Sequence, residues 1–209
     1  MKNEETNMRK LKYLLILLFT APVFVVAQTA KEYNSQGIAK AKALDYKGAI
    51  EDYNKALALD STDWTVLYNL GISKAKLQDY SGAIGDYTKS IVIHPDAASY
   101  FNRAISSFKS ASYGDAIADL DTTLVMNPKI SPEVYFLRGS SKFMLKDYEA
   151  ALPDFSKSIE MNPEDGKSFL YRGITEHHLN MRTISCDDLH RAEALGHAKA
   201  AENIKKFCQ

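Results

Sequence analysis

Four side chains capable of nucleophilic or metal chemistry lie close together near the C-terminal end of the sequence: His177, His178, Cys186 and His190. Cys186 and His190 are four residues apart, so on a helix they would share one face. That spacing suggests either a Cys–His nucleophile pair or a metal site. Neither is favoured, because the sequence has no CxxC or HExxH spacing and no residue clearly placed to orient the histidine.

The rest of the sequence offers little to a catalytic mechanism. It contains no Gly-rich phosphate loop and no serine nucleophile elbow. Its carboxylates are scattered along amphipathic stretches, where such groups are normally solvated. We therefore expect no enzymatic activity, no cofactor, no metal and no small-molecule substrate.

The first 27 residues have the composition of a secretory signal. A basic start precedes Tyr13–Ala27, an uncharged apolar run of 15 residues, which is shorter than the ~20 that span a bilayer as a helix. Val25 and Ala27 suit the −3 and −1 positions of a cleavage site, so the mature protein is predicted to start at Gln28 and to be periplasmic or secreted. The alternative is an uncleaved anchor that tethers the chain to the inner membrane.

Charge argues against nucleic acid as a partner. Residues 1–27 hold four of the 26 basic side chains and two of the 26 acidic ones, so the remainder carries a net charge of −2. Nucleic-acid binding normally requires a basic patch that neutralises phosphates. Membrane contact is expected only if the signal segment is retained.

One pattern organises nearly all of the remaining chain. A small residue recurs at close to 34 residues, a second small residue follows twelve positions later, and a large apolar one follows four further on. The three sets are Gly37, Gly71, Ala104, Gly139 and Gly173; Ala49, Ala83, Ala116, Ala151 and Ser185; and Tyr53, Tyr87, Leu120, Phe155 and Leu189. A period of this length with these marker positions resembles the tetratricopeptide repeat (TPR) family.

The resemblance implies an all-α fold, a TPR α-solenoid of about five helix-turn-helix repeats with a C-terminal capping helix. One domain should cover 28–209, because no low-complexity or Pro/Gly-rich linker divides it. Residues before Pro95, Pro128 and Pro163 should end second helices, since the residue before proline is pushed out of the α region. The repeats are expected at about 30–63, 64–96, 97–131, 132–165 and 166–196, and the capping helix at 197–207.

In TPR proteins the first helix of each repeat lines a concave groove. The resemblance therefore implies a non-enzymatic scaffold that binds a peptide or protein segment in that groove. Residues spaced by three and four along each first helix fall on one face. They give the predicted groove: Asn34, Tyr68, Ile72, Phe101, Ile105, Phe108, Phe136, Phe143, Leu170 and His177. For Phe108 and Phe143 the alternative is that they belong to the core, since one sequence does not separate two apolar faces.

Some TPR co-chaperones clamp a C-terminal carboxylate with lysine, asparagine and arginine side chains on successive first helices. Only Asn69 matches that set here. Repeat one has Asn34 and Ile38 at the clamp slots, and repeat three has Ala98 and Asn102. A chaperone-tail clamp is therefore not expected.

A carboxylate recurs in one slot of every second helix, and an arginine recurs in one slot of the last three first helices. The sequence suggests a ladder between neighbouring repeats, in which each carboxylate faces the arginine of the next hairpin. Its pairs would be Asp86–Arg103, Asp119–Arg138 and Asp154–Arg172, and Asp52 and Asp188 occupy the same carboxylate slot. The alternative is five solvated surface carboxylates.

The two cysteines are predicted to form a disulfide. The last second helix is expected to run from near Cys186 to near Leu195, and the capping helix from near His197 to near Cys208. A turn at Gly196 would make the two helices antiparallel and would bring both sulfurs to the open end of the hairpin. An exported chain would let the bond form and persist. Two free thiols are the alternative.

Overall fold

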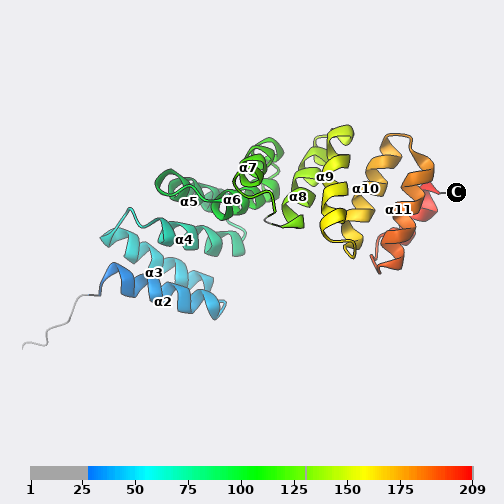
Figure 1. The fold of residues 1–209 in the computed structure, drawn as a ribbon. Coiled ribbons are helices and arrows are strands. Elements are labelled where there is room, and N and C mark those ends of the chain that lie inside the picture. The colour runs from blue at the N-terminus through cyan, green and yellow to red at the C-terminus, as the bar shows by residue number, and fades with distance from the viewer. Residues whose placement is uncertain (1–27, 130, 209) are drawn as a thin grey trace, which may run out of the picture.

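Helices form the whole of the regular structure in the computed structural model, which describes residues 28–129 and 131–208. The predicted signal segment lies outside these residues. Within the described residues, ten helices pair into five hairpins, and an eleventh follows them (Figure 1). The hairpins are α2 (Ala30–Lys42) with α3 (Tyr46–Leu59), α4 (Trp64–Lys76) with α5 (Tyr80–Ile93), α6 (Ala97–Lys109) with α7 (Tyr113–Met126), α8 (Pro132–Met144) with α9 (Tyr148–Met161), and α10 (Gly166–His178) with α11 (Arg182–Ala194), and the last helix is α12 (Ala200–Phe207).

The hairpins stack into a curved solenoid with two rows of helices. In the inner row, α2, α4, α6, α8 and α10 each contact the next member of the row. In the outer row, α3, α5, α7, α9 and α11 contact inner-row helices, and among the described residues no two of them contact each other. Successive hairpins approach each other more closely along the inner row than along the outer row. The stack therefore curves toward the inner row, which lines the concave face (Figure 1). The all-α TPR solenoid expected from the sequence is confirmed.

Each break between paired helices has the same backbone geometry. The residue before the second helix's N-cap adopts a positive φ in every hairpin, as at Leu44 (64°) and Gln78 (65°). In the first, second and fourth hairpins an aspartate follows and accepts a backbone N–H from inside the new helix, as Asp45 does from Gly48 and Asp79 from Gly82. Such a cap satisfies one of the donors left free at a helix start. In these three hairpins the capping aspartate therefore helps to fix where the second helix begins.

On three of the inner helices, α2, α4 and α8, the recurring glycine leaves room for an aromatic ring of the second helix. A Cβ added at Gly71 would lie 2.7 Å from Cε1 of Tyr87, and one added at Gly37 would lie 2.5 Å from the same atom of Tyr53. Both tyrosines are almost fully buried. Glycine in a helix costs about 1 kcal/mol relative to alanine, and the packing of these rings offsets that cost.

The last hairpin and α12 meet through a tight turn at Gly196, whose φ is 78°. Leu170, Leu189, Ala192 and Ala200 form the core of this end. Two predicted boundaries shift, because α11 begins at Arg182 rather than near Cys186 and α12 begins at Ala200 rather than at residue 197. The predicted disulfide is present in the structure: Cys186 and Cys208 are bonded, with their Cα atoms 5.7 Å apart.

Removing this disulfide should loosen the cap selectively. In the chain-entropy model, a bond closing a loop of roughly 20 residues stabilises a protein by about 3 kcal/mol. We expect Cys186→Ser/Cys208→Ser to lose roughly that much stability in urea unfolding. Faster amide exchange should be confined to α12 and the adjoining part of α11. Uniformly faster exchange across all five hairpins would contradict this expectation.

No helix in the described part of the chain is long and apolar enough to cross a membrane.

Candidate functional site

In the C-terminal half of the solenoid, two of the predicted groove residues belong to the core. Phe136 is only 9% exposed and Leu170 only 2%, so the prediction that both line an open groove is wrong. The Phe136 ring packs against Phe155 and Tyr171, with centroids 5.7 and 5.3 Å away. Phe136 belongs to the core because α10 of the next hairpin covers it, whereas Leu170 belongs to the core because it packs against α11 and the capping helix α12.

Other predicted groove residues are half-buried within aromatic contacts. Phe143 lies edge-on to Tyr148 at 5.4 Å, and Phe108 lies edge-on to Tyr113 at the same separation. His177 stacks on Phe207 of α12 with ring centroids 3.8 Å apart. These side chains stabilise the helix breaks and the cap, and much of their surface is unavailable to a partner. Three further members of the predicted set, Asn34, Phe101 and Ile105, are also half-buried.

The N-terminal half of the concave face has a hollow. It lies between α2 and α4, measures about 280 Å³ and is lined mostly by apolar atoms. Ile72, a predicted groove residue, and Ile38, its counterpart one repeat earlier, both line it. The remaining lining residues are Ala41, Lys42, Tyr46, Tyr53, Asn69, Ser73 and Lys76. Of the predicted set, Ile72 is the member that this hollow contains.

Side-chain size in one slot explains where the hollow lies. Four residues after the small marker, the first two repeats carry Ala41 and Ala75, whereas repeats three and four carry Phe108 and Phe143. A methyl group leaves open space where a phenyl ring would fill the concave face. This change from alanine to phenylalanine is visible in the sequence, and it could have been used to predict where the hollow lies.

A hydrogen bond joins α4 and α6, the inner helices of repeats two and three. The side-chain amide of Asn102 donates to the hydroxyl of Tyr68 over 2.9 Å. Tyr68 also lies 5.9 Å from the ring of Tyr87. Tyr68, another predicted groove residue, is thus half-buried and fixed between repeats two and three.

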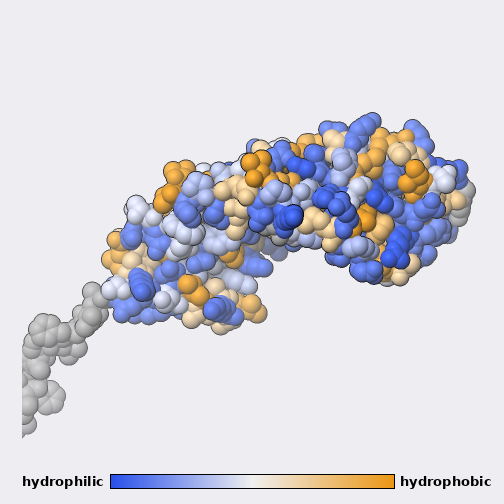
Figure 2. Space-filling model, in the orientation of Figure 1, coloured by the Kyte–Doolittle hydropathy of each residue, from blue (hydrophilic) through white to orange (hydrophobic). Residues whose placement is uncertain are grey.

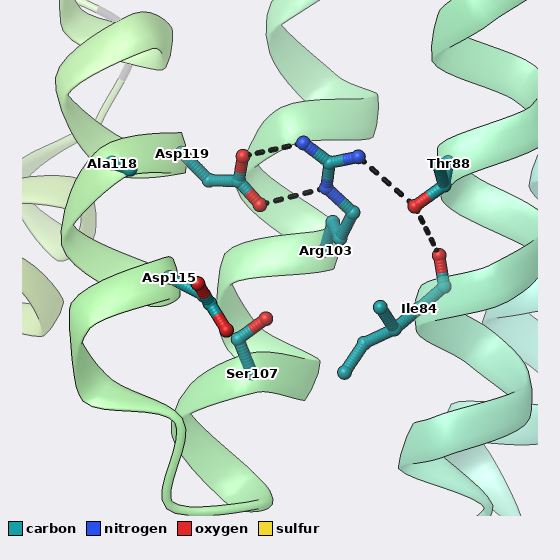
Figure 3. A pocket seen from close by; sticks show the side chains of 7 residues that line it. All are labelled: Ile84, Thr88, Arg103, Ser107, Asp115, Ala118 and Asp119. Atoms are coloured by element: carbon teal, nitrogen blue, oxygen red, sulfur yellow. Dashed lines mark hydrogen bonds and ion pairs between the residues drawn. The ribbon is translucent and has the colours of Figure 1, made fainter.

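The predicted charge ladder between repeats is wrong in its pairing. Arg103 donates to Asp119 of its own hairpin through Nε (2.8 Å) and Nη2 (2.7 Å), and its Nη1 donates to Thr88 of α5 over 3.0 Å (Figure 3). Asp119 is only 6% exposed, so it is not a solvated surface carboxylate either. Arg103 pairs within its own hairpin because its side chain lies on the face of α6 that is turned toward the outer row.

The same arrangement recurs in the other repeats. Arg138 and Arg172 bond the carboxylates of their own hairpins, Asp154 and Asp188. In the first two repeats, which lack the arginine, a lysine one turn further along the inner helix bonds the carboxylate: Lys40 lies 2.6 Å from Asp52, and Lys74 lies 2.6 Å from Asp86. Arg138 also reaches Asp121 of the preceding hairpin. The buried carboxylates therefore stabilise the fold, and the arginines and lysines that bond them are engaged within it.

Figure 3 shows a second hollow, of about 280 Å³, beside Arg103. Its guanidinium is already bonded to Asp119 and Thr88, and the Thr88 hydroxyl donates to the carbonyl of Ile84 over 2.7 Å. Because these groups satisfy each other, we interpret the site as a structural link between repeats two and three.

Repeat five contains a second buried carboxylate in addition to Asp188. The slot that holds Lys40, Lys74 and Lys142 in other repeats holds Glu176, which is 4% exposed. Its Oε1 lies 3.8 Å from Nε of Arg172, which is already bonded to Asp188. Burial, reinforced by the charge of Asp188, raises the pKa of Glu176 to about 7. Glu176 was not among the residues predicted from the sequence, although the change from lysine to glutamate at this repeat position was a visible signal.

This carboxyl group should make stability depend on pH. The ordinary pKa of 4.5 is lower than the folded value of about 7, so between these pH values the folded state holds a proton that the unfolded state has released. Stability should therefore fall as pH rises through this range. We expect Glu176→Gln to be more stable than the parent by about 2 kcal/mol at pH 8 and nearly equal to it at pH 5. Urea unfolding at both pH values measures this, and a constant difference would contradict it.

The cluster of potentially reactive residues is dispersed in the fold. Cys186 is bonded to Cys208. His178 stacks on Tyr148 with centroids 4.4 Å apart, and the ring of His190 lies 3.7 Å from a carboxylate oxygen of Glu193. Within residues 28–129 and 131–208, no group of three or more His, Cys, Asp or Glu side chains is placed to hold a metal ion.

Comparison with known proteins defines the class. The family model described as "TPR repeat" matches residues 45–78, and the one described as "Tetratricopeptide repeat" matches residues 132–165. These matches identify residues 45–78 and 132–165 as tetratricopeptide repeats, and the helical hairpins and marker residues above extend the same architecture along the described chain. No curated protein sequence matches it.

Solved structures with the same fold are numerous. YrrB, described as a TPR protein with an unusual peptide-binding site, has a TM-score of 0.77 at 21% identity over 85% of this chain and 92% of its own. MamA from Desulfovibrio magneticus RS-1, solved from residue 41 to its end, has a TM-score of 0.77 at 18% identity, covering 84% of this chain and 99% of the solved one. A further MamA structure has a TM-score of 0.73 at 21% identity, over 79% and 96%. Identities this low establish the shared fold. Proteins of this fold are, in general, scaffolds for protein–protein interactions.

Proposed function

We propose that the chain is a non-enzymatic scaffold that binds an extended segment of another protein on the concave face of its first two repeats. The observation that supports this most strongly is the hollow containing Ile38 and Ile72. An apolar recess next to half-buried side chains can receive an apolar side chain from a partner, and such buried anchors normally supply most of the affinity. The peptide-binding site described for YrrB, a protein of the same fold, is in keeping with this proposal.

We further propose that this scaffold acts outside the cytoplasm, with cleavage before Gln28. The support is the basic and apolar composition of residues 1–27. Intact mass of the chain recovered from the cell envelope tests this. A mass that retains residues 1–27 would favour the alternative, a scaffold tethered to the inner membrane by an uncleaved segment.

Site-specific photocrosslinking tests the binding face. A benzoylphenylalanine placed at Tyr46, which lines the hollow, should form a covalent adduct with a partner protein in envelope extracts. The control is the same group at Val92, which is 79% exposed on α5 of the outer row. Adducts from Val92 with none from Tyr46 would move the interaction to the other face and contradict the proposal.

A further inference from the structure

Two lysines flank the hollow between α2 and α4. Lys42 and Lys76 occupy the same slot of successive repeats, line the hollow and are exposed. Lys109 continues the row in repeat three and is also exposed. In the part of the chain that the structure describes, none of the three lies within ion-pair distance of a carboxylate, as the lysines of the neighbouring slot do.

The lysines two positions earlier provide an internal comparison. Lys40 and Lys74 each lie 2.6 Å from a buried aspartate of their own hairpin. Two residues along a helix correspond to a rotation of about 200°. One lysine of each pair thus turns toward the outer row and holds the hairpin together, and the other turns toward the concave face. Lys42 and Lys76 make no ion pair of this kind with any described residue, so their charges are available to a partner.

We propose that this hollow selects an acidic, extended protein segment, an inference that rests on the proposed function above. One apolar side chain of the segment enters the recess between Ile38 and Ile72, and carboxylates on either side of it reach Lys42 and Lys76. Contacting helices lie roughly 8–10 Å apart, and an extended chain crosses that distance in about three residues. The bound segment therefore carries two acidic residues about three positions apart with an apolar residue between them.

Charge and shape both favour this occupant. A purely apolar segment would leave two ammonium groups unpaired beside the interface, and a basic one would be repelled by them. A small inorganic anion would leave the apolar floor in contact with water. An acidic segment with an apolar anchor satisfies both parts of the site.

Selection of short random-sequence peptides displayed on phage, using the purified full-length chain as bait, tests the proposal. The expected result is enrichment of peptides with an apolar residue between acidic ones. Synthetic copies of the enriched peptides should bind Lys42→Glu/Lys76→Glu at least roughly tenfold more weakly, and high salt should weaken their binding to the parent. The matched control is Lys129→Glu/Lys205→Glu, which changes the net charge equally at two exposed positions away from the hollow and should bind like the parent.

The outcomes separate this proposal from the broader one. Enrichment of apolar or basic peptides that depends on Ile72 and not on the lysines would overturn the acidic partner and leave the groove intact. Enrichment of no peptide at all would overturn both. Equal weakening by the control variant would show a general charge effect and would also overturn the proposal. Matching melting temperatures of the two lysine variants should verify folding, since all four side chains are exposed.

Discussion

Replacing Arg103 with methionine is expected to destabilise the protein by about 3–5 kcal/mol, because Asp119 then stays buried without a cation. The position that supplies Lys142 as a second cation in repeat four holds Ser107 here, so no second cation takes over. The double variant Arg103→Met/Asp119→Leu should recover much of the loss, since apolar groups of similar size can replace a buried ion pair. Urea unfolding of the parent, both single variants and the double variant measures the coupling.

Repeat four supplies the matched control for this experiment. Asp154 is bonded by Arg138 and also lies 2.7 Å from Lys142. Arg138→Met therefore leaves one cation in place and should cost clearly less than Arg103→Met. Asp119 and Arg138, the pair suggested by the sequence pattern, should show effects that add to within about 0.5 kcal/mol. A strong coupling between Asp119 and Arg138 would contradict the pairing within each hairpin.

Phe136→Ala is the second change with a large expected effect. Its ring is buried against Phe155 and Tyr171, and the ammonium of Lys167 lies 3.8 Å from its centroid. Truncating a buried phenylalanine costs about 3–5 kcal/mol through lost contacts and the cavity that remains. We expect a large drop in melting temperature, with partner capture preserved at temperatures where the variant is folded.

Ile72→Ala should behave in the opposite way. Ile72 lines the hollow and is half-buried, so its truncation removes less core packing and more of the binding surface. Partner capture should weaken while the melting temperature changes little. If Phe136→Ala abolished capture without lowering the melting temperature, the sequence-based assignment of Phe136 to the groove would be right and the core assignment wrong.

The sequence by itself determined the fold because each repeat carries the same local instructions. The small marker at Gly71 and the ring of Tyr87 specify one close helix contact, and capping residues such as Asp79 specify where the second helix starts. These features act within a single hairpin, and their period shows that the hairpins stack. The pairing of Cys186 with Cys208 was predictable for the same reason, since it joins two helices adjacent in the chain.

Only the tertiary structure decided which apolar and charged side chains face a neighbour. Phe136 and Ile72 both lie on the predicted groove face, yet the next hairpin covers one and leaves the other beside a hollow. Likewise, Asp119 could pair forward with Arg138 or within its hairpin with Arg103, and the rotation of α6 against α7 selects Arg103. Helical periodicity gives the face of a residue on its own helix. What covers that face depends on how successive hairpins stack, and this is set by packing between residues far apart in the sequence.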